Sequence, residues 1–174
     1  EQRRHGGIGL GHLDAHAEEW EHLDSLCGVP ISRFYRDPAV FDALEHLVLP
    51  ALAAIAGAQS RTTIDCWSAG CASGEEPYTL AILWVVRLQP RCPQLDMRIV
   101  ATDLDERLLA RARAGRYAAS SLKELPEDLL AAGFEPADGG WRVRDRFRRV
   151  EFLRQDLREA MPDGPFDLIL CRNA

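Results

Sequence analysis

Residues 65–78 (DCWSAGCASGEEPY) combine an apolar run, a turn rich in glycine and serine, and two adjacent glutamates. The pattern predicts a buried strand, a turn that includes Gly70, and a helix that opens on Glu75 and Glu76. Strand, glycine-rich turn and helix is how α/β proteins seat a nucleotide-like cofactor. A phosphate cradle uses bare helix amides and a lysine, whereas this turn leads into two carboxylates. The run therefore indicates a ligand with cationic groups and no phosphate, and S-adenosylmethionine, with its sulfonium and ammonium, fits.

Alternating strands and helices must position this turn. Periodicity predicts strands at residues 63–68, 98–102 and 166–171, and helices at 75–89, 105–114 and 123–132. Residues 141–143 pair with 147–152 as a hairpin or lead into a third strand. Strands that alternate with helices predict an α/β fold with a parallel, doubly wound sheet and right-handed crossovers.

Polar residues follow each predicted strand, at the sheet edge where such folds bind ligands. Residues 70–75 follow the first strand and Asp103 the second, where a carboxylate can accept both ribose hydroxyls. Asp156 follows the third strand, placed to meet an adenine amino group or its neighbouring water. Arg172 and Asn173 follow the fourth. The repeated placement predicts one binding edge.

Each of these residues also has a simpler interpretation. Asp103 could be a helix N-cap, and Glu75 could do no more than complement a helix dipole. Asp156 could be a turn acid, and Arg36 a partner in a surface ion pair. Taken alone, Asp103 fits either interpretation equally well, and Asp156 fits the simpler one better.

Composition narrows the class of protein. The chain has 174 residues, 47% hydrophobic and 28% charged, as expected for one soluble globular domain with at most a small appendage. The net charge of −6 gives no support for nucleic-acid binding, and the arginines of 142–149 suggest a solvated edge. No apolar run approaches a membrane span, and no signal peptide opens the chain.

Cysteine and histidine do not suggest a metal site. Five cysteines form no CxxC pair, so reduced, packed thiols in the cytosol are expected. His12 and His16 lie on an acidic helix with no further ligands, so no metal is expected. Residues 70–74 are not a G-x-S-x-G elbow, and no histidine follows His46, which argues against a hydrolase.

The first part of the chain is predicted to be helical. Residues 1–11 suggest a flexible leader and 12–27 a helix. Asp37 is a predicted N-cap, and Pro38 begins a helix kinked at Pro50 and ended by Gly57. We therefore expect a helical segment with its connector at 1–60 and a cofactor-binding domain at 61–174. Because the chain lacks an initial Met and stops just after a strand, we expect it to be part of something longer.

Several of these motifs together resemble one family. Residues 67–78 resemble the cofactor motif of the CheR-type methyltransferases, which methylate chemoreceptor glutamates. Residues 101–105 and 114–117 resemble their next motifs, 32–37 is similar to their Thr-x-Phe-Phe-Arg segment, and 166–173 resembles their strand-four motif. The resemblance implies a Rossmann-like class I methyltransferase sheet that binds S-adenosylmethionine, with a short helical N-terminal segment and the C-terminal strands missing.

The resemblance also implies functional residues. Arg36 would hold the methionine carboxylate, Glu75 the ammonium and Asp103 the ribose, while Tyr35 and Arg36 would border the methyl-transfer site as catalytic candidates. The full set of implied cofactor contacts, with the turn glycine, is Ser32, Arg36, Gly70, Glu75, Asp103, Asp156, Leu157, Arg172 and Asn173.

The sequence departs from the family pattern in three respects. Pro30 stands where the family often has asparagine, and Ser32 replaces threonine. The helical N-terminal domain, which helps engage receptors in the family, is reduced to little more than residues 12–27. The chain ends before the aromatic residues that follow Arg-Asn, and before the last strands with their small inserted β-subdomain.

The function expected is a cytoplasmic S-adenosylmethionine-dependent methyltransferase of protein glutamates, with a chemoreceptor cytoplasmic domain as partner. An ionised carboxylate acceptor needs no general base, and in-line positioning would supply most of the catalysis. The alternatives are a CheR-like enzyme with another acceptor, small molecule or protein, and a non-catalytic cofactor-binding module. The apolar edge at 168–170 is expected to recruit another chain or aggregate.

Overall fold

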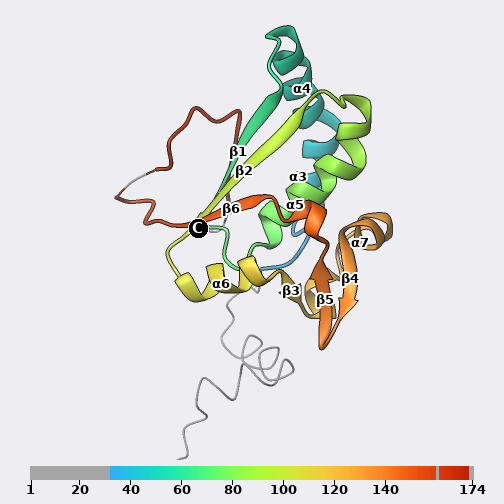
Figure 1. Cartoon of the computed structure of the whole chain (residues 1–174), viewed down its shortest axis with the longest axis vertical. Helices are drawn as coiled ribbons and strands as arrows, with labels where there is room; N and C mark the ends of the chain where they lie inside the picture. Colours follow the sequence, from blue (N-terminus) through green and yellow to red (C-terminus); the bar gives the residue numbers. More distant parts are fainter. Residues whose placement is uncertain (1–31, 160, 173–174) are drawn as a thin grey trace, which may run out of the picture. The chain divides into compact units, whose positions relative to one another are not determined.

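A computed structural model of the chain describes residues 32–159 and 161–172. Its main sheet has four strands, all paired in parallel: β1 (Thr63–Ala69), β2 (Asp96–Asp103), β6 (Val150–Arg154) and β7 (Leu168–Cys171). The strand order is β6-β2-β1-β7; Figure 1 labels β6, β2 and β1. The chain builds outward from β1 through β2 to β6 and then returns to the other side of β1. This reversal is the switch point at which doubly wound sheets bind ligands, and the predicted fold class is confirmed.

The alternation of side chains along β1 divides the core between the two faces of the sheet. Ile64 and Cys66 are buried in the main cluster, which includes the apolar helix α5 (Glu75–Leu83). Trp67 points to the other face, where it packs with Phe166, their ring centroids 5.8 Å apart. The segment between β6 and β7 therefore covers the face opposite α5.

One continuous helical run precedes β1. It consists of α3 (Pro38–Ala43), a π-helical turn (Leu44–Val48) and α4 (Leu49–Ala58). Pro50 has no N–H to donate, and the predicted irregularity appears as the π turn before it, where the Leu49 N–H bonds to the carbonyl of Leu44. Gly57 does not end the helix, because α4 continues to Ala58.

The same helical run corrects an expectation about membranes. Pro38–Ala58 is 21 residues long with a mean hydropathy of 1.7, long and apolar enough by composition to cross a bilayer. The expectation that no apolar run approaches this length was wrong. Phe41, Leu44 and Leu49 of this run are buried in the main core, and 22% of the apolar window is buried in all.

A second, smaller sheet was not predicted. It is antiparallel, in the order β3-β5-β4, and consists of β3 (Arg116–Tyr117), β4 (Phe134–Ala137) and β5 (Gly140–Val143). Of the two alternatives for residues 141–143, the hairpin with 147–152 was wrong, because β5 pairs with β3 and β4. The other was right, because β5 leads into β6, which joins the main sheet. We expected a small β-subdomain only beyond the last residue, yet a small antiparallel sheet lies within the chain.

The helices around β2 largely follow the predictions. After α5 come a π turn (Trp84–Leu88) and a 3-10 turn (Gln89–Arg91). Asp105 caps α6 (Glu106–Ala114), and Gly115 ends it with φ 65°. The helix predicted at 123–132 is instead a 3-10 turn (Ala119–Leu122) and α7 (Glu127–Gly133). A further 3-10 turn (Asp145–Phe147) precedes β6.

The connector at residues 32–37 is part of the described core. Phe34 is fully buried, with its ring centroid 4.7 Å from that of Tyr117 and 5.0 Å from that of Phe134. The predictions made for residues 1–31 lie outside the described residues, and the boundary near residue 60 stays a prediction.

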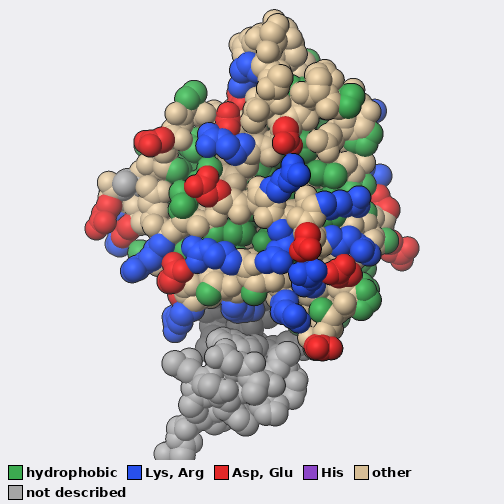
Figure 2. Space-filling model, viewed as in Figure 1, with side chains coloured by type: hydrophobic (Ala, Val, Ile, Leu, Met, Phe, Trp, Pro, Cys, Tyr) green, Lys and Arg blue, Asp and Glu red, His purple; other side chains and the backbone are tan. Residues whose placement is uncertain are grey.

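The surface combines both signs of charge. Figure 2 shows basic side chains interspersed with acidic side chains across this face. Arg142 pairs with Glu135 at 2.8 Å, and Arg142 and Arg148 each reach Asp145, so part of the arginine-rich segment is neutralised within the fold. The β7 edge exposes 53% of Ile169; its self-association stays a prediction.

Candidate cofactor site

The turn after β1 is held in place by β2. The N–H groups of Gly70 and Cys71 both donate to the Thr102 carbonyl, at 2.8 and 2.9 Å. The Ala72 N–H donates to Oδ2 of Asp103 at 2.8 Å. Ala72 itself has a left-handed backbone, φ 47°, a conformation that non-glycine residues rarely adopt and that often marks functional sites. The end of β2 therefore fixes the shape of the turn.

Gly74 is required where the turn enters α5. Its φ is +92°, and a Cβ at this position would lie 2.9 Å from Cβ of Ala112 and 3.2 Å from the hydroxyl of Tyr117. The Tyr117 hydroxyl donates to the carbonyl of Ser73 at 2.6 Å. Tyr117, a residue of the small sheet, thus supports the turn through this hydrogen bond.

Asp103 ends β2 and organises two backbones. Oδ2 accepts from Ala72 as above, and Oδ1 accepts the N–H of Asp105 at 2.9 Å. The helix N-cap is Asp105 rather than Asp103, so the capping interpretation of Asp103 was wrong. Each carboxylate oxygen still has a second acceptor position, which leaves both available to a pair of hydroxyls.

Glu75 is buried at the first turn of α5, only 1% exposed. The Ser73 hydroxyl lies 2.8 and 3.0 Å from its two carboxyl oxygens. Burial raises the pKa of Glu75, while hydrogen bonds from Ser73, its own backbone and Ser32 and the charge of Arg111 act in the opposite direction. A nearby cation stabilises the ionised form of a buried carboxyl group, so this position favours a cationic ligand group.

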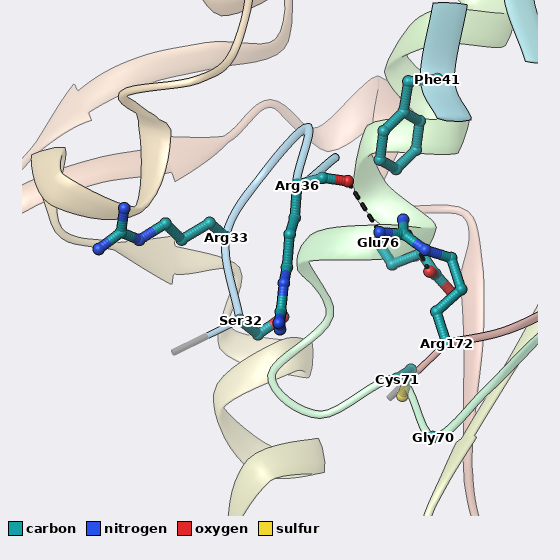
Figure 3. A pocket seen from close by; sticks show the side chains of 8 residues that line it. All are labelled: Ser32, Arg33, Arg36, Phe41, Gly70, Cys71, Glu76 and Arg172. Atoms are coloured by element: carbon teal, nitrogen blue, oxygen red, sulfur yellow. Dashed lines mark hydrogen bonds and ion pairs between the residues drawn. The ribbon is translucent and has the colours of Figure 1, made fainter. Parts of the chain in front are cut away.

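A small cavity opens at the switch point between β1 and β7 (Figure 3). Its volume is about 40 Å³. It joins the connector, the turn after β1, the start of α5 and the end of β7. The lining residues are Ser32, Arg33, Arg36, Phe41, Gly70, Cys71, Glu76 and Arg172. Four predicted residues, Ser32, Arg36, Gly70 and Arg172, therefore meet in one place.

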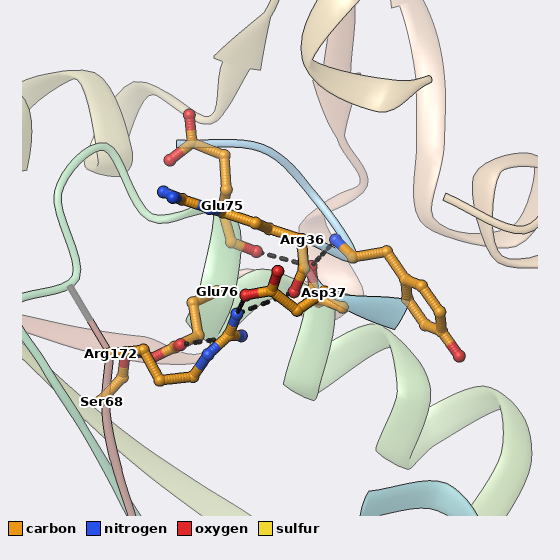
Figure 4. Close-up of polar contacts among 8 residues, drawn as sticks. Arg36, Asp37, Ser68, Glu75, Glu76 and Arg172 are labelled. Carbon is orange, nitrogen blue, oxygen red and sulfur yellow. Dashed lines mark hydrogen bonds and ion pairs between the residues drawn. The ribbon is translucent and has the colours of Figure 1, made fainter. Parts of the chain in front are cut away.

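Arg172 links three of these segments. Its Nη2 donates to the Arg36 carbonyl at 2.9 Å and forms an ion pair with Asp37. Its Nη1 lies 3.5 Å from Oε2 of Glu76, and its guanidinium stands over the ring of Phe41. Figure 4 shows the Asp37 and Glu76 carboxylates around this guanidinium. Arg172 is thus fixed by acids from the connector and from α5.

Glu76 is the second carboxylate of the predicted pair and is already partnered. The Ser68 hydroxyl donates to its Oε1 at 2.7 Å, and Oε2 faces Arg172. Burial raises the pKa of Glu76, opposed by the Ser68 hydrogen bond and by the charge of Arg172. Of the two adjacent glutamates, Glu76 thus pairs with an arginine of the described chain, whereas the described side-chain partner of Glu75 is the Ser73 hydroxyl.

Tyr35 does not line this cavity. Its side chain is buried, its ring centroid is 5.0 Å from that of Phe41, and its hydroxyl donates to Oδ1 of Asp42 at 2.8 Å. Burial, reinforced by the hydrogen bond to Asp42, raises the pKa of Tyr35. A catalytic part for Tyr35 stays a prediction, and its described contacts are those of a core residue.

The residues after β6 form a separate part of the edge. Asp156 pairs with the Arg158 side chain at 2.6 Å. This contact, together with a hydrogen bond from the Arg158 backbone N–H, lowers the pKa of Asp156 to about 2. Leu157 packs with Trp67 on the face of the sheet that also holds Phe166. Neither residue lines the small cavity, and Asn173 lies outside the described residues.

The predicted cofactor contacts included neither Asp37 nor Cys71. Asp37 was assigned as an N-cap, yet its side chain makes no cap hydrogen bond and pairs with Arg172 instead. Cys71 lines the cavity, and burial raises the pKa of its thiol, so it stays protonated. The signal for Asp37 was its position next to Arg36 in the connector motif.

The donor set fits S-adenosylmethionine in its charged groups. Three arginines line the small cavity and suit a carboxylate, while the buried Glu75 suits an ammonium and Asp103 suits two hydroxyls. None of the 8 lining residues is a lysine. Within residues 32–159 and 161–172 no group of histidine, cysteine and acidic residues could hold a metal ion.

A parallel sheet with a rigid glycine turn and acids at its carboxyl edge defines the class of nucleoside-cofactor-binding α/β domains. A family model described as "CheR methyltransferase, SAM binding domain" matches residues 31–174. The chain belongs to the CheR methyltransferase family, and the matched region is its S-adenosylmethionine-binding domain.

Curated relatives agree with this membership. A "Chemotaxis protein methyltransferase" of Listeria monocytogenes is 35% identical over 163 residues, which is 93% of this chain and 59% of the relative. "Chemotaxis protein methyltransferase 2" of Vibrio cholerae is 34% identical, over 92% of this chain and 56% of its own length. The chain thus spans less than two thirds of each. A TehB-like SAM-dependent methyltransferase of Corynebacterium glutamicum aligns over 92% of this chain and 54% of its own, with TM-score 0.36 and 15% identity.

Proposed function

We propose that this chain holds S-adenosylmethionine for methyl transfer to glutamate side chains of a protein, with the cytoplasmic domain of a chemoreceptor as acceptor. The single observation that carries the proposal is the convergence of Ser32, Arg36, Gly70 and Arg172 at the switch point, beside the buried Glu75. The names of the relatives support a chemotaxis protein as acceptor. The site of action would be the cytoplasm.

The residues would divide the cofactor between them. Arg36 and Arg172 would hold the carboxylate of the methionine part, and Glu75 its ammonium. Asp103 would accept the ribose hydroxyls, and Asp156 with Leu157 would border the adenine. The cofactor supplies an electrophilic methyl group on a sulfonium.

The acceptor needs little activation by the protein. A glutamate carboxylate is ionised at neutral pH, so no general base has to remove a proton. The chain's task is to align the acceptor oxygen with the methyl carbon at near-contact distance and to exclude water. The protonated Cys71 thiol at the cavity cannot compete as a nucleophile, because the thiolate is the reactive form.

The proposal is tested with tritiated S-adenosylmethionine. The chain is incubated with chemoreceptor membranes and, in parallel, with a metabolite extract. We expect label in the receptor band that is released as volatile methanol by mild base, as a methyl ester would be. Label found only in small molecules would contradict the acceptor, and cofactor binding with no product in either mixture would contradict the enzyme.

A matched variant separates chemistry from background. Glu75→Gln keeps the size of the side chain but removes the charge offered to the ammonium, so labelling should fall with it. Asp96→Asn removes an exposed acid at the start of β2, away from the turn, and should leave labelling unchanged. Equal labelling by all three proteins would remove Glu75 from the proposal.

A further inference from the structure

A second cavity lies at the opposite end of β2. Its volume is about 200 Å³, larger than that of the cavity at the switch point. Met97 and Ile99 of β2 line it, while Asp103 ends the same strand. At about 3.3 Å per residue, Met97 and Asp103 are separated by roughly 20 Å along the strand. The two cavities are therefore distinct.

The wall of this cavity is apolar. Trp84 of the π turn after α5 and Phe147 before β6 are each 1% exposed, Ile99 2% and Met97 8%. Such a surface binds a hydrocarbon body rather than a polar one. The volume corresponds to a molecule of about the size of a branched six-carbon acid, about seven times the roughly 30 Å³ that one water occupies.

The rim carries more positive than negative charge. Arg146, Arg149 and Asp96 line the cavity. Arg146 lies over the Phe147 ring at 4.5 Å and donates to the Ala132 carbonyl, and one Asp96 oxygen accepts the Met97 N–H at 2.9 Å. Within the described part of the chain, Arg149 makes no hydrogen bond or ion pair. The Arg149 guanidinium is therefore available to bind an anion.

Trp84 adds a second unsatisfied donor. Its Nε1 is buried and has no hydrogen-bond partner among the described residues. Buried indole N–H groups nearly always find an acceptor. A ligand that enters beside Trp84 with an acceptor group would supply one.

We propose that this cavity is a binding site for a small monocarboxylate with an apolar body. The hydrocarbon part lies on Met97, Ile99 and Phe147, and the carboxylate accepts the Trp84 indole N–H and is bound by Arg149. The site is separate from the cofactor edge, so it stands or falls independently of the methyl-transfer proposal.

Titration with 4-methylpentanoate tests the site. The readout is the indole N–H resonance of Trp84 in nitrogen-15 spectra of the full chain, assigned by its loss in Trp84→Phe. We expect a saturable shift with the acid and none with 3-methylbutylamine, which has a similar body and the opposite charge. An unmoved resonance at about 20 mM acid, a concentration at which even weak fragments bind, or an equal shift with the amine, overturns the proposal.

Two arginine variants make the test specific. Arg149→Gln should weaken 4-methylpentanoate binding at least fivefold. Arg116→Gln removes an exposed arginine of β3 that does not line the cavity and should bind the acid like the unmodified chain. Unchanged affinity in Arg149→Gln, or equal losses in both variants, would contradict the assignment. Melting temperatures of both variants verify that each is folded.

Discussion

Asp37 and Arg172, 135 positions apart in the chain, form an ion pair, and Arg172 also lines the small cavity at the switch point. Asp37 has a left-handed backbone, φ 60°, and so does Tyr35, φ 58°. Two strained residues around Arg36 are a local conformation that surrounding contacts must maintain. The Arg172 side chain, bonded to both Asp37 and the Arg36 carbonyl, is one such contact. The pair ties the connector to the end of β7.

We therefore predict that Asp37 positions Arg172 for the cofactor. Asp37→Asn should release S-adenosylhomocysteine about three- to tenfold faster, because a partly exposed ion pair contributes about 1 kcal/mol. Stopped-flow displacement measures the rate. Asp37→Glu, which keeps the charge, should restore part of the retention. Glu124→Gln breaks a second ion pair of the connector, Arg33–Glu124 at 3.7 Å, and should leave the release rate unchanged. A rate raised equally by Glu124→Gln would show general loosening instead.

Asp103→Ala tests the end of β2. We expect S-adenosylmethionine to bind more weakly by about 1.5–3 kcal/mol, the range for hydrogen bonds to a charged group. The loss includes the two backbone N–H groups of Ala72 and Asp105 that Asp103 now holds. Calorimetry measures the affinity. Asp96→Ala, an exposed acid at the start of the same strand, is the control, and unchanged affinity in Asp103→Ala would make the assignment wrong.

Glu75 should make cofactor binding depend on pH. Burial raises the pKa of Glu75 above its ordinary 4.5, and only the ionised form attracts an ammonium. Affinity should therefore fall as pH decreases through the raised pKa, and binding should release protons into the buffer. Calorimetry between about pH 5 and 7 in buffers of different ionisation enthalpy measures both.

The same residue predicts an opposite effect on folding. A carboxyl group whose pKa is raised in the folded protein stabilises it when protonated, below pH 4.5, and that contribution is lost as pH rises through the raised value. Glu75→Gln should thus unfold at a higher temperature near neutral pH while it binds the cofactor more weakly. If this variant kept the unmodified pH dependence of binding, another group would be responsible.

Two glycines give a matched test of the turn. Gly74→Ala places a methyl 2.9 Å from Cβ of Ala112 at φ +92°, and should lower the free energy of unfolding by about 1–3 kcal/mol. Gly57 lies in helix α4 with nothing within 4 Å of a new Cβ. Gly57→Ala should stabilise by about 0.5–1 kcal/mol. Denaturant unfolding measures both, and a neutral Gly74→Ala would mean that the turn can move.

The sequence predicted the main sheet because its signals are local. These signals, which need no tertiary information, are the apolar run before Gly70, the acid at the end of β2 and the Asp105 to Gly115 boundaries of α6. The small sheet was missed because β3 has two residues and β5 pairs with it from beyond α7. Asp138-Gly139, between β4 and β5, is a hairpin signal that could have found half of it.

The sequence predicted which residues form the candidate site, but not which of them pair with one another. Acids after β1 and β2 follow from the periodicity of the strands. Glu76 faces Arg172, 96 positions further along the chain, while Glu75 is buried beside Ser73. These pairings depend on how α5 packs against the end of β7. A sequence gives the charges at an edge, whereas packing decides which of them remain for a ligand.

The most direct measurement is a crystal structure of the chain with S-adenosylhomocysteine, accompanied by calorimetric competition with ATP. The account predicts the ligand at the carboxyl ends of β1 and β2, with its ammonium at Glu75, its ribose at Asp103 and its carboxylate among Arg36 and Arg172, and no displacement by ATP. A ligand bound elsewhere, or ATP bound at this edge with higher affinity, would contradict it.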